Sequence, residues 1–272
     1  MSSSPFQRLL LTGAAGALGR VLRPALRPHA DVLRVSDRLP LEAAQADEVV
    51  LCDLADKAAT DALVRGCDAI VHLGGISVEQ AFEEVLDANI RGVFHLYEGA
   101  RRHGVRRVVF ASSNHVVGFH RQDQALGTDC ERRPDGYYGL SKAFGEDLSR
   151  FYFDRYGIET VCLRIGSAYA APKDQRMLST WLSFADLEQL VVRSLLTPQV
   201  GHLIVYGVSA NPSTWWSNEK AARLGFAPRD SSAAFDNTAA LPAAAPGSPE
   251  ALFQGGAFVV RGPFETLPEV NA

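Results

Sequence analysis

The sequence predicts an α/β fold: a Rossmann-type doubly wound parallel sheet with a small C-terminal substrate-binding region. Short apolar runs alternate with helical patterns as far as residue 170, a glycine-rich turn follows the first run, and an aspartate follows the second. Regular alternation of strands and helices is typical of a parallel sheet with helices on both faces. We therefore expect a nucleotide-binding domain over residues 1–170 and a partly interleaved substrate-binding region over 171–272.

The composition is that of an ordinary globular protein, with 47% hydrophobic and 21% charged residues. The net charge of -4 indicates neither nucleic-acid binding nor a polybasic membrane anchor. The apolar run at residues 8–12 could open a signal peptide, but it is far shorter than the roughly 20 residues of a membrane span, and arginines follow it. The four cysteines show no paired or metal-ligand spacing. We expect a cytoplasmic protein without a metal site.

The first strand and helix are predicted around a glycine-rich turn. Residues 8–12 form the strand, and apolar residues recur at helical spacing over 18–26, where Pro24 removes one backbone hydrogen bond. Between them stand Gly13, Gly16 and Gly19. Glycines in such a turn let the backbone approach a pyrophosphate, whose charge the helix N-terminus stabilises.

The second strand is predicted over residues 32–35, shortly before Asp37. Asp37 lies about 20 residues beyond the glycine turn, where a carboxylate would accept hydrogen bonds from the adenosine ribose. The same charge would repel a 2′-phosphate, which favours NAD over NADP. Arg38 leaves NADP open, because a guanidinium there could bind that phosphate.

The remaining elements follow in regular order. Further strands are predicted over 49–52, 69–73, 107–111 and 160–165, with helices over 55–64, 82–96 and from Tyr138 onwards. Beyond Gly166 the pattern predicts a mostly helical segment over 178–196, a strand over 203–206 and a helix from about Ser217 to Gly225. It also predicts an alanine- and proline-rich loop over 239–249.

Polar segments follow the fourth and fifth strands, at the edge where sheets of this kind bind ligands. They are residues 74–77, Gly-Gly-Ile-Ser, and residues 112–115, Ser-Ser-Asn-His. The second segment could equally be a turn whose side chains bind local backbone.

Tyr138 and Lys142 are four residues apart and project from one face of a helix. An ammonium beside a phenol lowers the pKa of the phenol, so Tyr138 is a candidate proton acceptor. Taken alone, the pair is more often a packed ring and a solvated charge.

Together these features resemble the extended short-chain dehydrogenase/reductase superfamily. The resemblance rests on the glycine turn, Asp37, Asp53, Asn89, Ser113, Tyr138-x-x-x-Lys142 and Arg164. It implies that Tyr138 is the general base, that Lys142 lowers its pKa and holds the nicotinamide ribose, and that Ser113 hydrogen-bonds the reacting oxygen. Aligning residues 116–118 with the family's Val-Tyr-Gly selects Ser113 rather than Ser112. The implied NAD site comprises Gly13, Gly16, Ala17, Leu18, Gly19, Asp37, Arg38, Asp53, Leu54, Leu73, Gly74, Gly75, Asn89, Tyr138, Lys142 and Ile165.

Four segments narrow the resemblance to the uronate dehydrogenases, nearly end to end. They are residues 72–79, 111–115, 176–181 and 253–256. This resemblance implies oxidation of the C1 hemiacetal of galacturonate or glucuronate to an aldarolactone, with NAD accepting the hydride. The implied sugar site comprises Ser77, Ser113, Asn114, His115, Tyr138, Ser167 and Arg176. Ala17 is a departure, because a relative has glutamine there.

The residues agree with this chemistry. Tyr138 would take the hydroxyl proton, the nicotinamide would take the hydride, and Ser113 would stabilise charge on the oxygen. Arg176 could hold the substrate carboxylate through two parallel bonds, or be a solvated surface arginine. His115 could contact the sugar or be a structural donor.

Two other classes of protein share the same cofactor-binding motifs. A nucleotide-sugar epimerase or dehydratase generally needs a larger C-terminal region than this chain offers. A non-catalytic NAD-sensing regulator usually lacks the tyrosine. We expect a homo-oligomer that binds a small hexuronate and neither nucleic acid nor membrane, with the preferred hexuronate left open.

Overall fold

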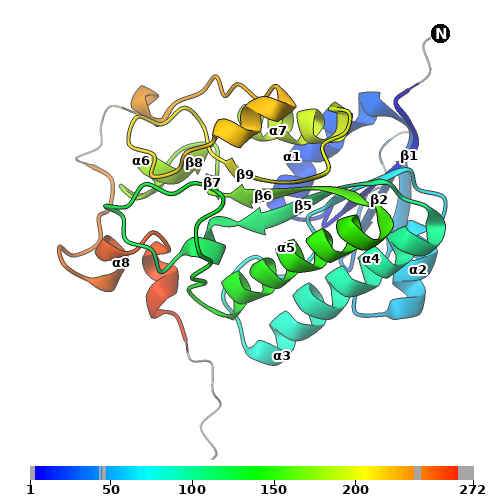
Figure 1. The fold of residues 1–272 in the computed structure, drawn as a ribbon, viewed down its shortest axis with the longest axis horizontal. Coiled ribbons are helices and arrows are strands. Elements are labelled where there is room, and N and C mark those ends of the chain that lie inside the picture. The colour runs from blue at the N-terminus through cyan, green and yellow to red at the C-terminus, as the bar shows by residue number, and fades with distance from the viewer. Residues whose placement is uncertain (1–3, 43, 45–46, 236–239, 263–272) are drawn as a thin grey trace, which may run out of the picture.

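The computed structural model describes residues 4–42, 44, 47–235 and 240–262. A parallel sheet of seven strands forms its centre, in the order β3-β2-β1-β4-β5-β6-β9 (Figure 1). Every neighbouring pair in it is parallel. The strands are β1 Phe6–Thr12, β2 Ala30–Asp37, β3 Asp47–Leu51, β4 Ala69–His72, β5 Arg107–Ser113, β6 Glu159–Ile165 and β9 His202–Gly207. The predicted doubly wound parallel sheet is confirmed.

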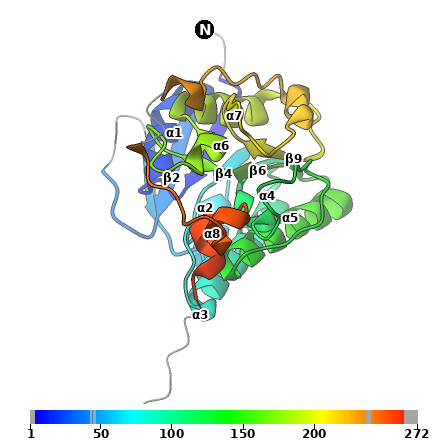
Figure 2. The same cartoon turned by 90° about the vertical axis from the view of Figure 1, so that its left-hand side faces the viewer.

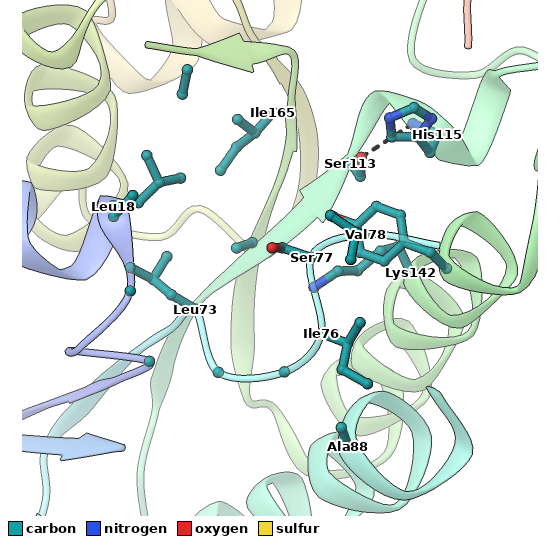
Figure 3. A pocket seen from close by; sticks show the side chains of 18 of the residues that line it. Leu18, Leu73, Ile76, Ser77, Val78, Ala88, Ser113, His115, Lys142 and Ile165 are labelled. Atoms are coloured by element: carbon teal, nitrogen blue, oxygen red, sulfur yellow. Dashed lines mark hydrogen bonds between the residues drawn. The ribbon is translucent and has the colours of Figure 1, made fainter. Parts of the chain in front are cut away.

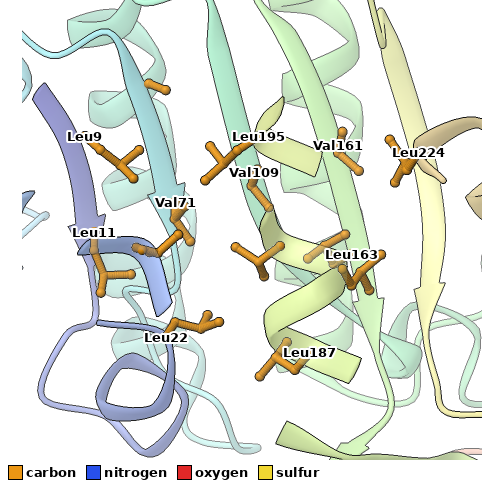
Figure 4. Packing of buried hydrophobic residues seen from close by; sticks show 14 of the residues in the cluster. Leu9, Leu11, Leu22, Val71, Val109, Val161, Leu163, Leu187, Leu195 and Leu224 are labelled. Atoms are coloured by element: carbon orange, nitrogen blue, oxygen red, sulfur yellow. The ribbon is translucent and has the colours of Figure 1, made fainter. Parts of the chain in front are cut away.

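Helices cover both faces of the sheet (Figure 1). One face carries α1 Ala17–Leu26 and α7 Phe184–Leu196, and the other carries α2 Lys57–Val64, α4 Gly92–His103 and α5 Tyr137–Tyr156. Successive side chains of a strand point to opposite faces. Leu9 and Leu11 therefore pack with Leu22 and Leu187 (Figure 4), while Leu10 belongs to the second apolar cluster. Burial on both faces explains why the strands are continuous apolar runs.

Local contacts set where two helices begin and end. The Asp56 side chain accepts hydrogen bonds from the backbone N–H groups of Ala58 (2.9 Å) and Ala59 (3.0 Å), so α2 begins at Lys57 rather than at residue 55. The helix predicted over 82–96 extends to His103. It ends at Gly104, whose φ of 75° suits glycine.

That long helix contains a π-helical turn. It comprises α3 Phe82–Val85, the π turn Leu86–Arg91 and α4. A π turn inserts one residue into the helical ladder, and such turns are frequent at functional sites. Here the turn contains the buried Asn89.

The segment over residues 178–196 is mostly helical, as predicted, but two helices form it. The segment comprises α6 Met177–Thr180, β8 Trp181–Leu182 and α7. β8 pairs in parallel with β7 Ser167–Ala168, and the Ser183 hydroxyl accepts a hydrogen bond from the Asp186 N–H (3.0 Å), which starts α7. Sheet pairing and a new cap therefore override helical periodicity here.

The rest of the C-terminal region is mostly irregular. The helix predicted from about residue 217 is a 3-10 helix, Glu219–Leu224, ended by Gly225. Residues 241–248 of the predicted loop are neither helix nor strand, and Ala239 lies outside the described residues. The described residues also form the short helices η1 Arg27–His29, η3 Asn114–Val117, η5 Ser232–Ala234, α8 Pro249–Leu252 and η7 Gly256–Val260.

Residues beyond 170 divide between the sheet layers and a cover over one edge. α7 and β9 belong to the sheet and its helical layer, whereas α8 and η7 lie across the edge toward which the arrowheads of β5 and β6 point (Figures 1 and 2). In the part of the chain that the structure describes, no helix is long and apolar enough to cross a bilayer.

Candidate functional site

A cleft of about 850 Å³ runs along the carboxyl edge of the parallel sheet. Side chains from separate elements converge on it: Figure 3 shows Ser77, Ser113 and Lys142 facing a common space, with Leu18, Leu73 and Ile165 across from them. Apart from Asn89, every predicted site residue lines the cleft: Gly13, Gly16, Ala17, Leu18, Gly19, Asp37, Arg38, Asp53, Leu54, Leu73, Gly74, Gly75, Ser77, Ser113, Asn114, His115, Tyr138, Lys142, Ile165, Ser167 and Arg176.

The glycine turn leaves no room for a side chain at Gly13 or Gly19. Gly13 has a φ of 70°, and a Cβ there would lie 2.7 Å from the carbonyl carbon of Leu73. A Cβ at Gly19 would lie 2.2 Å from the Gly13 carbonyl oxygen. Gly16 precedes α1 and supplies no side-chain cap, so the first N–H groups of this helix are left for an anionic ligand.

Asp37, at the end of β2, holds the turn in place. Its carboxylate accepts hydrogen bonds from the backbone N–H groups of Ala15 (3.0 Å) and Leu39 (3.1 Å). Asp37 remains partly exposed beside the exposed Arg38. Its free lone pairs fit the hydroxyls of a ribose, so the glycine turn and this carboxylate together fit a dinucleotide.

Asn89 supports the cleft without lining it. Its Oδ1 accepts from the Ile76 N–H (2.7 Å), and its Nδ2 donates to the Ile76 carbonyl (3.0 Å) and to the Ser141 hydroxyl (2.9 Å). Ser141 in turn donates to the Tyr138 carbonyl (2.7 Å). The π turn therefore ties the loop after β4 to the helix that carries Tyr138.

Tyr138 and Lys142 are both buried on α5, with 7% and 6% of their surface exposed. The Lys142 Nζ lies 5.6 Å from the centre of the Tyr138 ring. Burial raises the pKa of Tyr138 to about 12, although its hydrogen bond with Ser113 acts in the opposite direction. Burial also lowers the pKa of Lys142 to about 8. The sequence predicts that Lys142 lowers the pKa of Tyr138, and this role stays a prediction, because burial is the largest influence on that pKa.

The two adjacent serines have different partners. The Ser112 hydroxyl donates to Glu146 (2.7 Å), which forms a buried ion pair with Arg164. Ser113 instead accepts from the His115 N–H (3.2 Å), and its hydroxyl acts to lower the pKa of Tyr138. This geometry favours Ser113 as the serine that meets a ligand.

Arg176 is partly buried and firmly held. Its Nε donates to the Gln254 carbonyl oxygen (2.8 Å), and its Nη2 donates to the same atom. With the Asn114 amide oriented so that its oxygen faces Arg176, Nη2 also donates to that oxygen (2.9 Å), and the Asn114 nitrogen donates to the Ile165 carbonyl (3.0 Å). Arg176 is therefore not a freely solvated surface arginine. Nearby, the hydroxyls of Ser167 and Thr180 are hydrogen-bonded (2.9 Å).

Four residues to which the sequence analysis assigned no role complete the site. Glu79 accepts from the backbone N–H groups of Tyr137 (2.7 Å) and Tyr138 (2.8 Å), at the start of α5. Asp135 accepts from His115, Phe258 stacks on the same imidazole, and the fully buried Gln254 holds Arg176. Pro134-Asp135-Gly136 indicates only a turn in the sequence, and the other contacts are long-range.

Among the described residues, no group of three or more His, Cys, Asp or Glu side chains could hold a metal ion. The charged residues that line the cleft are Asp37, Arg38, Asp53, Glu84, Lys142, Asp174, Arg176 and Arg261. They suit an anionic dinucleotide at the glycine turn and a polar ligand between Tyr138 and Arg176.

Comparisons with known proteins agree with this geometry. Residues 9–201 match the model of the NAD dependent epimerase/dehydratase family. The uronate dehydrogenase of Pseudomonas putida is 58% identical over 97% of this chain and 100% of that protein. The crystal structure of uronate dehydrogenase from Agrobacterium tumefaciens has a TM-score of 0.91 and 50% identity, covering 94% of this chain and 97% of that one. A mutant of the same enzyme, complexed with NAD, has a TM-score of 0.91 and 49% identity over 94% of this chain and 98% of that chain.

Proposed function

The chain belongs to the NAD dependent epimerase/dehydratase family, alongside the uronate dehydrogenases, and from this premise we propose that it oxidises the C1 hemiacetal of a hexuronic acid to the aldarolactone. One observation carries the proposal: a single cleft joins the glycine turn to Tyr138 and to Arg176. Such a cleft brings a dinucleotide, a proton acceptor and a carboxylate receptor together.

The protein's part in the reaction is to position the sugar and move one proton. NAD, when bound along the glycine turn, supplies the acceptor for the C1 hydride. Tyr138 takes the proton of the C1 hydroxyl. Ser113, which lines the cleft with Tyr138, stabilises the charge that develops on this oxygen. Lys142 favours the phenolate form of Tyr138 when it is protonated and donates to the nicotinamide ribose.

The substrate carboxylate is assigned to Arg176. Its Nε and Nη2 donate to the Gln254 carbonyl, and Nη1 donates to no atom of the residues that the structure describes. The outer edge of the guanidinium can therefore bind a carboxylate. Ser77, Asn114 and Ser167 supply hydroxyl and amide groups around the ring of the sugar. This arrangement needs no nucleotide on the substrate.

The test is NADH formation with galacturonate, glucuronate, the matching neutral hexoses and UDP-sugars. We expect turnover of at least one free uronate, and much slower turnover of neutral sugars. Tyr138→Phe serves as the control for background reduction of NAD. Turnover of a UDP-sugar without turnover of any free uronate would favour a nucleotide-sugar epimerase or dehydratase instead.

We further propose that the protein acts as a homo-oligomer in the cytoplasm. Large apolar side chains are exposed on α4 and α5, namely Phe94, Leu140 and Phe151, which favours self-association. The four free cysteines suit a reducing compartment. Light scattering coupled to gel filtration tests the oligomeric state, and a mass equal to one chain would overturn it.

A further inference from the structure

His115 and Asp135 form a close pair at the wall of the cleft. The Nδ1 atom of His115 lies 2.6 Å from Oδ2 of Asp135. The imidazole is stacked on Phe258, with ring centres 3.8 Å apart, and meets the Tyr138 ring edge-on at 5.7 Å. A backbone hydrogen bond from the Asp135 N–H to the His115 carbonyl (3.3 Å) joins the same two residues. Both ring orientation and position are therefore fixed.

The Asp135 carboxylate is buried at a cost in stability, and two glycines leave space for it. Its side chain has 0% exposure, and Oδ1 has no hydrogen-bond partner. A Cβ at Gly118 would lie 1.9 Å from Oδ2, and a Cβ at Gly255 would lie 2.0 Å from it. Burying a carboxylate with one oxygen unpaired destabilises a fold. Packing alone does not explain Asp135, because an apolar side chain would fill this space without that cost.

The pairing fixes which ring nitrogen of His115 carries a proton. A carboxylate only accepts hydrogen bonds, so the short contact places a proton on Nδ1. Charged groups around the ring act in both directions: Asp135 and Glu79 raise the pKa of His115, while Arg176 lowers it. Burial has the largest effect and lowers the pKa of His115, which favours a neutral ring. A neutral ring protonated at Nδ1 has a lone pair at Nε2.

That lone pair is available to a ligand. Nε2 of His115 has no hydrogen-bond partner among the residues that the structure describes, and it is not a buried atom cut off from the cleft. His115 lines the cleft. An acceptor at this position would repel a carboxylate and bind a hydroxyl. Arg176, which only donates, has the opposite preference.

We propose that Asp135 is a positioning residue that holds His115 as the Nδ1-protonated tautomer, so that Nε2 accepts a hydrogen bond from a sugar hydroxyl. The two residues then recognise different groups of the sugar: His115 binds a hydroxyl, and Arg176 binds the carboxylate. This inference rests on the proposed hexuronate substrate. It makes Asp135 a determinant of specificity although Asp135 itself does not touch the sugar.

The first test is direct observation of the tautomer. Histidine labelled with ¹⁵N in the NAD-bound protein should show His115 protonated at Nδ1 and unprotonated at Nε2, with assignment by His115→Gln. Asp135→Asn should reduce the Nδ1-protonated fraction, because an amide can also donate to this nitrogen. A proton on Nε2 and none on Nδ1 in the unmutated protein would overturn the proposal. This measurement needs no variant of Asp135 that folds.

The second test is kinetic and uses a panel of monodeoxy hexuronates. Asp135→Asn should lower kcat/KM for the complete uronate by about 10- to 100-fold, the size of one buried hydrogen bond, with NAD affinity retained. For the one analogue that lacks the hydroxyl read by His115, the two proteins should differ only a few-fold. Equal losses for every analogue would show that Asp135 only supports the fold.

The two proposals fail separately. If the unmutated protein oxidises no uronate, the proposed function is wrong, and the NMR experiment still measures the tautomer. If uronates are oxidised but the proton lies on Nε2, only the role of Asp135 is wrong.

Discussion

Tyr138 lies in a buried environment that works against its ionisation. Burial favours the neutral phenol, whereas the proposed reaction needs the phenolate. On the acid side kcat/KM should therefore rise with pH as Tyr138 ionises. Below about pH 8, where Lys142 carries its charge, replacing it with an uncharged residue should lower the fraction of phenolate and therefore kcat/KM. A pH–rate profile that the substitution leaves unchanged would contradict the role of Lys142.

The Tyr138→Phe substitution keeps the ring and removes the proton acceptor. We expect kcat to fall by about 10² or more, with NAD affinity and the circular dichroism spectrum retained. NADH formation and NAD titration measure the two effects. Activity within a few-fold of the unmutated protein would mean that another group is the base.

The buried ammonium of Lys142 should lower the free energy of unfolding of the protein. Its pKa in the folded protein, about 8, lies below the ordinary value of 10.5, so the folded state binds fewer protons than the unfolded state between these pH values. Stability should therefore rise with pH across this window. Lys142→Met removes the buried ammonium and should raise the free energy of unfolding at pH 7 by about 1 to 3 kcal/mol, a gain that shrinks towards pH 10.5.

Urea unfolding at pH 7 and at pH 10 measures that gain. Lys57→Met, at an exposed lysine, is the matched control and should change stability little. If Lys142→Met were no more stable than its parent at pH 7, burial would not be penalising the ammonium.

Arg176 is expected to discriminate acids from neutral sugars. Arg176→Ala should lose about 2 to 4 kcal/mol in kcat/KM for uronates, because a carboxylate is left unpaired away from water. The loss should be small for a neutral pyranose. Arg176→Lys should retain part of the activity, since lysine supplies charge without the planar fork. Equal losses for both substrate types would assign Arg176 to loop structure.

At the scale of the element, Glu79 determines how α5 begins. Gly136 precedes α5 without a side-chain cap, and Glu79 accepts from the first two N–H groups instead. Glu79→Gln replaces one acceptor oxygen by a donor that faces an N–H group. We expect the free energy of unfolding to fall by about 1 to 2 kcal/mol and kcat to fall several-fold as Tyr138 shifts.

Thermal unfolding and kinetics of Glu79→Gln check this expectation. Glu83→Gln, at an exposed glutamate of α3, is the control and should have almost no effect. Similar behaviour of the two variants would show that Glu79 does not anchor α5.

The elements differ in how well their sequences predict them. Strands such as β1 and β5 are buried on both faces, and their apolar runs alone mark them out. The break at Trp181 is invisible to helical periodicity, because β8 exists only through pairing with β7. The π turn is hidden for a related reason: one inserted residue hardly disturbs the apolar pattern.

The same limit applies to the site. Gly13, Asp37, Tyr138 and Lys142 stand at fixed spacings that carry their chemistry, and all four line the cleft. Asp135 and Phe258 reach the site only because distant segments meet at His115. No local pattern encodes such contacts, so neither residue could be singled out from the sequence.

At the scale of the whole molecule, NAD binding should stabilise the fold. The proposed site joins β1, β2, β4 and α5, so binding to the folded state alone raises the free energy of unfolding by about 2.7 kcal/mol at one hundred times Kd. NADP should stabilise much less, because Asp37 repels its 2′-phosphate. Asp37→Ser should reduce the difference between the stabilisation by NAD and that by NADP. Thermal shifts with both dinucleotides measure it, and equal shifts in the unmutated protein would refute the role of Asp37.

Gln254 accepts a hydrogen bond from Arg176, and Phe258 stacks on His115. These contacts imply that the parts of the cleft form one after another as the chain is made. During synthesis the glycine turn leaves the ribosome early, and residues 253–261 follow only after every strand of the parallel sheet has been made. Contacts between such distant segments form late, because closing a long loop costs entropy. A growing chain therefore completes the nucleotide side of the cleft first. It gains its selectivity for a sugar only when η7, its last described helix, packs against His115.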